Sequence, residues 1–89
     1  MIRVKAPFSL FNGYETFPAG TMAVVSADQA KRVVCCGGDV VDGDGNPVPL
    51  NEAVRMLRMN ADDLAMAEDP ARRTALAAAI TAYIEPQEG

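Results

Sequence analysis

The chain has 89 residues, of which 49% are apolar and 22% charged, so it supports one small hydrophobic core and is too apolar for a disordered protein. Twelve acidic and eight basic residues give a net charge of −4. We expect no nucleic-acid partner, because phosphate binding needs a concentrated positive surface. The sequence contains no signal-peptide pattern and no apolar run of membrane length, so we expect a protein made in the cytoplasm without membrane contact.

The first part of the chain has the pattern of β-strands joined by tight turns. Residues 2–5 alternate between apolar and basic side chains, which predicts a strand with one buried face. Residues 8–11 and 14–17 flank an Asn-Gly pair at 12–13, which predicts a hairpin with a two-residue type I′ turn. Residues 21–25 form a further predicted strand. Because four of the five aromatic residues lie in this hairpin region, we expect the densest part of the core there.

A helix is predicted directly after these strands. Ser26 and Gln29 have the spacing of a capping box, so the helix should begin at Ala27. The Gly pair at 37–38 should end it, because glycine readily adopts the left-handed conformation. The predicted buried face of this helix consists of Ala27, Ala30, Val33 and Val34.

A short strand at 39–41 and a turn at 42–47 predict a second hairpin that returns at Val48. In this turn Asp42, Asp44 and Asn46 have the spacing of the first ligands of a calcium loop. The pattern then departs from that loop, because Pro47 replaces the required glycine and Ala53 occupies the position of the bidentate Glu. The preferred interpretation is a solvated turn, and a calcium site is the alternative; we expect no other metal and no cofactor.

The second half of the chain has helical periodicity. Five apolar residues spaced by four, three, four and three positions form an apolar seam: Leu50, Val54, Leu57, Ala61 and Leu64. Asn51 is the expected N-cap, and the pattern allows either one helix over 51–67 or a break near Asn60.

Three methionines, Met56, Met59 and Met66, add soft apolar surface beside this seam. Core packing within the chain is the first interpretation of these residues. The alternative is an interface with another chain, whose candidate residues are Leu50, Val54, Met56, Leu57, Met59, Leu64 and Met66.

A last helix is predicted from Pro70 to Ile84, since Asp69 is a good N-cap and proline fits the first helical position. Its bulky face consists of Leu76, Ile80, Tyr83 and Ile84. The fold class is therefore α+β. Residues 1–48 form a small antiparallel sheet with one packed helix, and residues 49–89 form a hairpin of two antiparallel helices packed on this module or on a neighbouring subunit.

The chain contains no group of residues with the composition of an active site. It has no His, and its only two cysteines, Cys35 and Cys36, are adjacent, so they form neither a relaxed disulfide nor a zinc site. Acidic side chains near predicted helix starts are typical of residues that stabilise a helix dipole. We therefore expect no enzyme.

The spacing of turn, cap and glycine residues over 2–41 resembles that of small accessory proteins encoded among the structural genes of tailed bacteriophages and prophages. The matching features are a basic first strand, Phe8 after a proline, the Phe-Pro-Ala-Gly segment at 17–20 before a strand, a Ser-capped helix and the glycine pair at 37–38. The resemblance implies a virion protein without enzymatic activity. Such a protein would be associated with the phage head, would decorate the capsid, or would join the head to the tail.

Such a protein would be assembled in the bacterial host cytoplasm and would contact copies of itself or other virion proteins. The alternative function is a cytosolic regulatory module that binds a host or phage protein, since an acidic surface suits a basic target. An exposed strand edge at 21–25 would be a further candidate contact.

Overall fold

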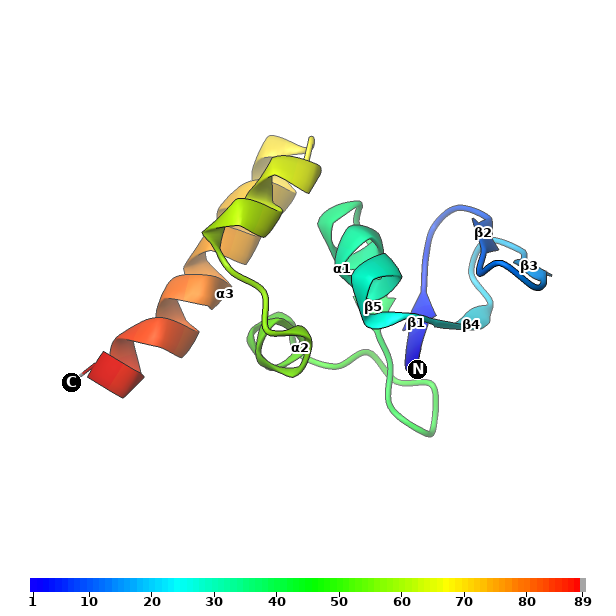
Figure 1. Cartoon of the computed structure of the whole chain (residues 1–89), viewed down its shortest axis with the longest axis horizontal. Coiled ribbons are helices and arrows are strands. Elements are labelled where there is room, and N and C mark those ends of the chain that lie inside the picture. The colour runs from blue at the N-terminus through cyan, green and yellow to red at the C-terminus, as the bar shows by residue number, and fades with distance from the viewer. Residues whose placement is uncertain (89) are drawn as a thin grey trace.

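A three-stranded antiparallel sheet with the order β4-β1-β5 forms the first layer of the fold (Figure 1). The computed structural model describes the backbone of residues 1–88 and the side chains of residues 1–82. The central strand is β1 (Ile2–Lys5), with β4 (Met22–Val25) on one side and β5 (Asp39–Val40) on the other. The helix α1 (Ala27–Cys35) packs against this sheet, and the predicted α+β class is confirmed.

Alternation in β1 decides which face of the sheet is buried. Val4 is fully buried and pairs with Ala23 of β4 and Val40 of β5, both also buried. Arg3 and Lys5 point to the other, solvent-exposed face. The period-two pattern therefore predicted this strand and its orientation correctly.

The aromatic hairpin forms a separate two-stranded sheet of β2 (Leu10–Phe11) and β3 (Thr16–Phe17). The predicted two-residue turn is wrong, because Phe11 pairs with Thr16 and leaves a loop of residues 12–15. Asn12 explains the difference, since its side-chain Oδ1 accepts hydrogen bonds from the backbone N–H groups of Tyr14 (2.9 Å) and Glu15 (3.0 Å). An Asn side chain that mimics a backbone turn in this way widens the loop.

The start of α1 is as predicted at Ala27, although only half of the predicted capping box forms. Ser26 Oγ accepts a hydrogen bond from the backbone N–H of Gln29 at 3.2 Å. The Gln29 side chain does not bond back to Ser26. Its Nε2 donates instead to the carbonyl oxygen of Phe11 at 2.8 Å, which ties the hairpin to the helix. Ala27, which was predicted on the buried face, is exposed because it lies at the first helical position, beyond the sheet.

The glycine pair ends α1 as predicted, and each glycine has its own reason. Gly37 adopts a φ of +99°, a left-handed value that favours glycine. At Gly38 an added Cβ would lie 2.3 Å from Cγ1 of Val33 and 2.9 Å from the carbonyl oxygen of Lys5. The end of the helix therefore approaches β1 too closely for any side chain.

Residues 51–67 do not form one helix. The chain breaks near Asn60, which was the second of the two predicted alternatives. The helix α2 (Leu50–Leu57) begins after Pro49, one residue before the predicted cap at Asn51. It ends at Arg58, whose φ of +53° is left-handed. Asn60 then caps the 3-10 helix η1 (Ala61–Met66) in a reciprocal capping box with Asp63.

The last helix, α3 (Pro70–Glu88), begins at the predicted proline and continues past the predicted end at Ile84. Figure 1 shows α2 nearly end-on and α3 lengthwise, so these two packed helices, which η1 separates along the chain, are not the antiparallel pair that was expected. The side chains of Tyr83 and Ile84, placed by prediction on its bulky face, lie outside the described residues.

One hydrophobic cluster spans both predicted modules. It combines Val4 and Val33 with Val54 and Leu76, all of them at most 1% exposed. Arg72 of α3 adds a polar connection to the end of α1. Its Nε donates to the carbonyl oxygen of Val34 at 2.7 Å, its Nη2 donates to that of Gly38, and it lies 3.8 Å from Oδ1 of Asp39.

Replacing this arginine should weaken the whole fold. We expect Arg72→Met to lower the free energy of unfolding by about 2 kcal/mol, because the carbonyl groups of Val34 and Gly38 lose their charged donor. Urea denaturation measures the loss. Arg3→Met is the matched control, since Arg3 is exposed on the outer face of the sheet. Equal stability of the two variants would contradict the role of Arg72.

Candidate contact surface

The structure places most of the predicted interface residues inside the chain. Val54, Leu57 and Met59 are at most 4% exposed and belong to the hydrophobic cluster. Leu50, Leu64 and Met66 are partly buried against that cluster. Met56 differs from the rest of the set because 50% of its surface is exposed. The break at Asn60 folds the seam back on itself, so α3 and α1 cover it.

The aromatic hairpin is the opposite case, and the prediction that it forms the densest part of the core is wrong. Phe8, Phe11 and Tyr14 are 36%, 62% and 91% exposed, and Phe17 is only partly buried. Leu10 is the deeply buried residue of the two strands. A signal for this was present in the sequence, because aromatic side chains on both faces of a two-stranded hairpin cannot all turn inward.

Two side-chain hydrogen bonds hold the hairpin in place. Gln29 connects α1 to the backbone of Phe11, as described above, and Asn12 Nδ2 donates to the carbonyl oxygen of Val24 at 3.0 Å. The second bond also occupies an outward-facing carbonyl of β4, which is an edge strand of the main sheet. The hairpin is therefore anchored at both the helix and the sheet, and it partly covers the strand edge that the sequence offered as a contact.

A groove of about 500 Å³ separates the hairpin from the outer face of α1. We call it the contact groove. Phe8 and Phe11 form its apolar wall, and Asp28 and Arg32 stand on its helical wall. Neither charged side chain has an ion-pair partner in the described part of the chain. The full lining is Phe8, Leu10, Phe11, Asn12, Gly13, Ser26, Asp28, Gln29, Arg32, Val33 and Cys36.

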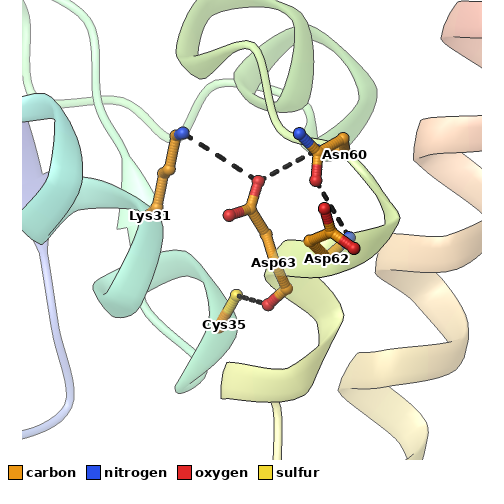
Figure 2. A network of polar contacts seen from close by, with 5 residues as sticks. All are labelled: Lys31, Cys35, Asn60, Asp62 and Asp63. Atoms are coloured by element: carbon orange, nitrogen blue, oxygen red, sulfur yellow. Dashed lines mark hydrogen bonds and ion pairs between the residues drawn. The ribbon is translucent and has the colours of Figure 1, made fainter.

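A second polar region connects α1 to η1, and Figure 2 shows it at close range. Asp63 is at its centre: its Oδ2 accepts from the backbone N–H of Asn60 at 2.9 Å and lies 3.9 Å from Lys31 Nζ. The Cys35 thiol donates to the Asp63 carbonyl oxygen at 3.4 Å. Burial, reinforced by the negative charge of Asp63, raises the pKa of the Cys35 thiol. These contacts hold α1 against η1. They also favour the protonated thiol of Cys35, whereas a nucleophilic cysteine reacts as the thiolate.

The candidate calcium residues form a turn that is closed by its own side chain. Asp42 Oδ1 accepts hydrogen bonds from the backbone N–H groups of Asp44 (2.9 Å) and Asn46 (3.0 Å). This oxygen faces the backbone of the turn. Within the described residues, no three His, Cys, Asp or Glu side chains are grouped so that they could hold a metal ion.

Comparisons with known proteins return no relative: no family model matches the chain, and no curated protein or solved structure matches it significantly. In the part of the chain that the structure describes, none of the helices has the length and apolar character needed to span a bilayer.

The two cysteines should react at different rates. Cys36 is exposed and Cys35 is buried with a raised pKa, so we expect iodoacetamide to alkylate Cys35 about tenfold or more slowly than Cys36 near pH 8. Peptide mass spectrometry over time measures both rates. Because the folded protein holds the Cys35 proton more tightly than the unfolded chain, stability should also fall as the pH rises past the ordinary thiol pKa. Equal alkylation rates would contradict the packing around Cys35.

Calcium should leave the melting temperature unchanged, since Asp42 already binds the backbone of its own turn. Thermal melts with and without millimolar calcium test this expectation. Asp42→Ala should lower stability by about 1 kcal/mol under both conditions, because two backbone N–H groups lose their acceptor. A calcium-dependent rise in melting temperature that Asp42→Ala removes would contradict this expectation and support the calcium-site interpretation.

Proposed function

We propose that this chain is a non-enzymatic structural or assembly protein of a tailed-phage particle, and that it acts through protein–protein contacts made by the aromatic hairpin. The observation that supports this proposal is the exposure of Phe11 and Tyr14 on a hairpin that is anchored to both the helix and the sheet. Aromatic residues are enriched in protein interfaces, where a rigid ring buries a large area at a small entropic cost.

The position of the hairpin supports the same proposal. A small domain normally uses its aromatic residues to build its core, since each ring buries on the order of 150–250 Å². Among the described residues, the core instead consists of Val, Ala, Leu, Ile, Met and Cys side chains, and Phe8, Phe11 and Tyr14 are exposed. That distribution favours a contact made outside the chain. The resemblance over residues 2–41 then suggests a virion, assembled in the bacterial host cytoplasm, as the setting.

Particle incorporation tests the proposal. An epitope-tagged chain, expressed in the host during particle production, should co-sediment with density-purified particles, and its deletion should reduce the yield of complete particles. The double variant Phe11→Ser/Tyr14→Ser should lose incorporation about tenfold or more, because the apolar contact is removed. Met56→Ser is the matched control, an exposed apolar residue on α2 outside the contact groove.

Two outcomes would overturn the proposal. One is normal particle yield after deletion, with the tagged chain absent from particles. The other is stoichiometric binding of the free chain to one host or phage enzyme, which would support the regulatory alternative.

A further inference from the structure

We infer that Asn12 is a site of spontaneous deamidation, and that this modification releases the aromatic hairpin from the main sheet. The inference goes beyond the proposed function, because it concerns the chemistry of the chain itself and holds whatever the hairpin contacts. Three observations carry it: the glycine that follows Asn12, the hydrogen bonds that its side-chain oxygen accepts, and the hydrogen bond that its side-chain nitrogen donates.

The backbone nitrogen of Gly13 is the group that attacks the Asn12 side chain. Glycine has no Cβ, so this nitrogen approaches the preceding side-chain carbonyl with little steric hindrance. Gly13 is exposed, and apart from its chain neighbours no heavy atom lies within 4 Å of the place where a Cβ would stand. Within the described residues the N–H of Gly13 donates no hydrogen bond. The nitrogen is therefore not held back from Cγ of Asn12.

The side-chain oxygen of Asn12 already lies against two backbone donors. When the nitrogen attacks Cγ, negative charge collects on Oδ1 in the tetrahedral intermediate. The N–H groups of Tyr14 and Glu15 donate to this same oxygen at 2.9 and 3.0 Å. Backbone donors at these distances stabilise the oxyanion that forms in acyl transfer. The hydrogen bonds that close the loop therefore also favour the reaction of the Asn12 side chain.

The reaction consumes water, releases ammonia and needs no oxidant or reductant. The Gly13 nitrogen loses its proton to solvent base and forms a bond to Cγ, and the bond between Cγ and Nδ2 breaks. Nδ2 takes up a proton from solvent and leaves as ammonia, so that a cyclic imide remains. Water then adds to either imide carbonyl and breaks its bond to the nitrogen. Addition at Cγ gives aspartate, and addition at the backbone carbonyl gives isoaspartate.

The modification removes the donor that ties the hairpin to the sheet. Nδ2 of Asn12 donates to the carbonyl oxygen of Val24 at 3.0 Å. A carboxylate in its place has no proton to donate, and its negative charge repels this carbonyl oxygen. Gln29 still holds the hairpin to α1, because its bond does not involve Asn12. The released edge is that of β4, where the carbonyl of Val24 becomes available to another strand.

Timed incubation of the full chain tests the modification. At about pH 8 and about 37 °C, Asn12 should convert to aspartate and isoaspartate about tenfold or more faster than Asn60. Asn60 is the matched control, because its side-chain oxygen also accepts from a backbone N–H while alanine follows it. Asn46 should remain intact, since Pro47 has no N–H with which to form the imide. Peptide mass spectrometry measures the three sites.

The same measurement in urea tests the contribution of the fold. Unfolding removes the two backbone donors to Oδ1, so Asn12 in the folded chain should convert at least as fast as in the unfolded chain.

The variant Asn12→Asp tests the release of the hairpin. It should raise the hydrogen exchange of the hairpin N–H groups about fivefold or more, because a stabilising hydrogen bond is replaced by a repulsion. Tyr14→Asp is the matched control, since it places the same charge on the same loop, at a side chain that is 91% exposed, and keeps the bond from Asn12 to Val24. Wild-type protein in which Asn12 has converted should exchange as Asn12→Asp does.

If circular dichroism shows that Asn12→Asp does not fold, Asn12→Ser replaces it. The serine hydroxyl still accepts a hydrogen bond within the loop and is too short to reach Val24.

Three results would overturn the inference. The first is conversion of Asn12 no faster than that of Asn60. The second is conversion about tenfold or more slower in the folded chain than in urea, which would show that the fold protects this side chain. The third is hairpin exchange that stays at the wild-type rate in the folded Asn12→Asp or Asn12→Ser variant, or that rises equally in Tyr14→Asp.

Discussion

The fold depends on how the carbonyl groups at the C-terminal end of α1 find hydrogen-bond donors. A helix ends with carbonyl groups that have no partner within it, and here the end of α1 packs closely against β1 at Gly38. Arg72 of α3 donates to the carbonyl oxygen of Val34 in the last turn of α1 and to that of Gly38 just beyond it, and it also faces Asp39 of β5. One side chain therefore joins the last helix, the first helix and the sheet. This connection and the shared hydrophobic cluster make residues 1–48 and 49–82 parts of one core.

Several polar side chains have a structural task. Asp63 caps η1 and faces Lys31, Asp42 closes its own turn, and Cys35 donates to a backbone carbonyl. A group that is already committed to backbone hydrogen bonds is costly to recruit for binding, because the backbone loses its partner. The hairpin and the wall of α1 facing it carry exposed aromatic residues and two charged side chains without an ion-pair partner in the described residues. There the apolar area and the unpaired charges lie side by side.

The anchoring of the hairpin links its structure to its proposed role. An isolated two-stranded hairpin is marginally stable in water, so exposed aromatic residues on it would normally move. Asn12 and Gln29 oppose that motion through hydrogen bonds that join the hairpin to β4 and α1. The hydrogen bond from Asn12 also occupies a carbonyl group of the edge strand β4. That carbonyl is then not available to pair with a strand of another chain. Phe11 and Tyr14 are thereby exposed on a hairpin that is tied to the rest of the fold.

The sequence by itself determined the local features of this protein. The cap at Ser26, the glycine pair at 37–38, the Asp-Pro start of α3 and the alternation of β1 each depend on a few neighbouring residues, so each was predictable. Only the tertiary structure decided what the apolar faces meet. Periodicity shows that a face is apolar and says nothing of its partner, so the seam around Leu57 and the aromatic hairpin were equally good core candidates. Packing of α2 and η1 against α1 and α3 buried the first, while the Asn12 and Gln29 hydrogen bonds tied the second to the outside of the fold.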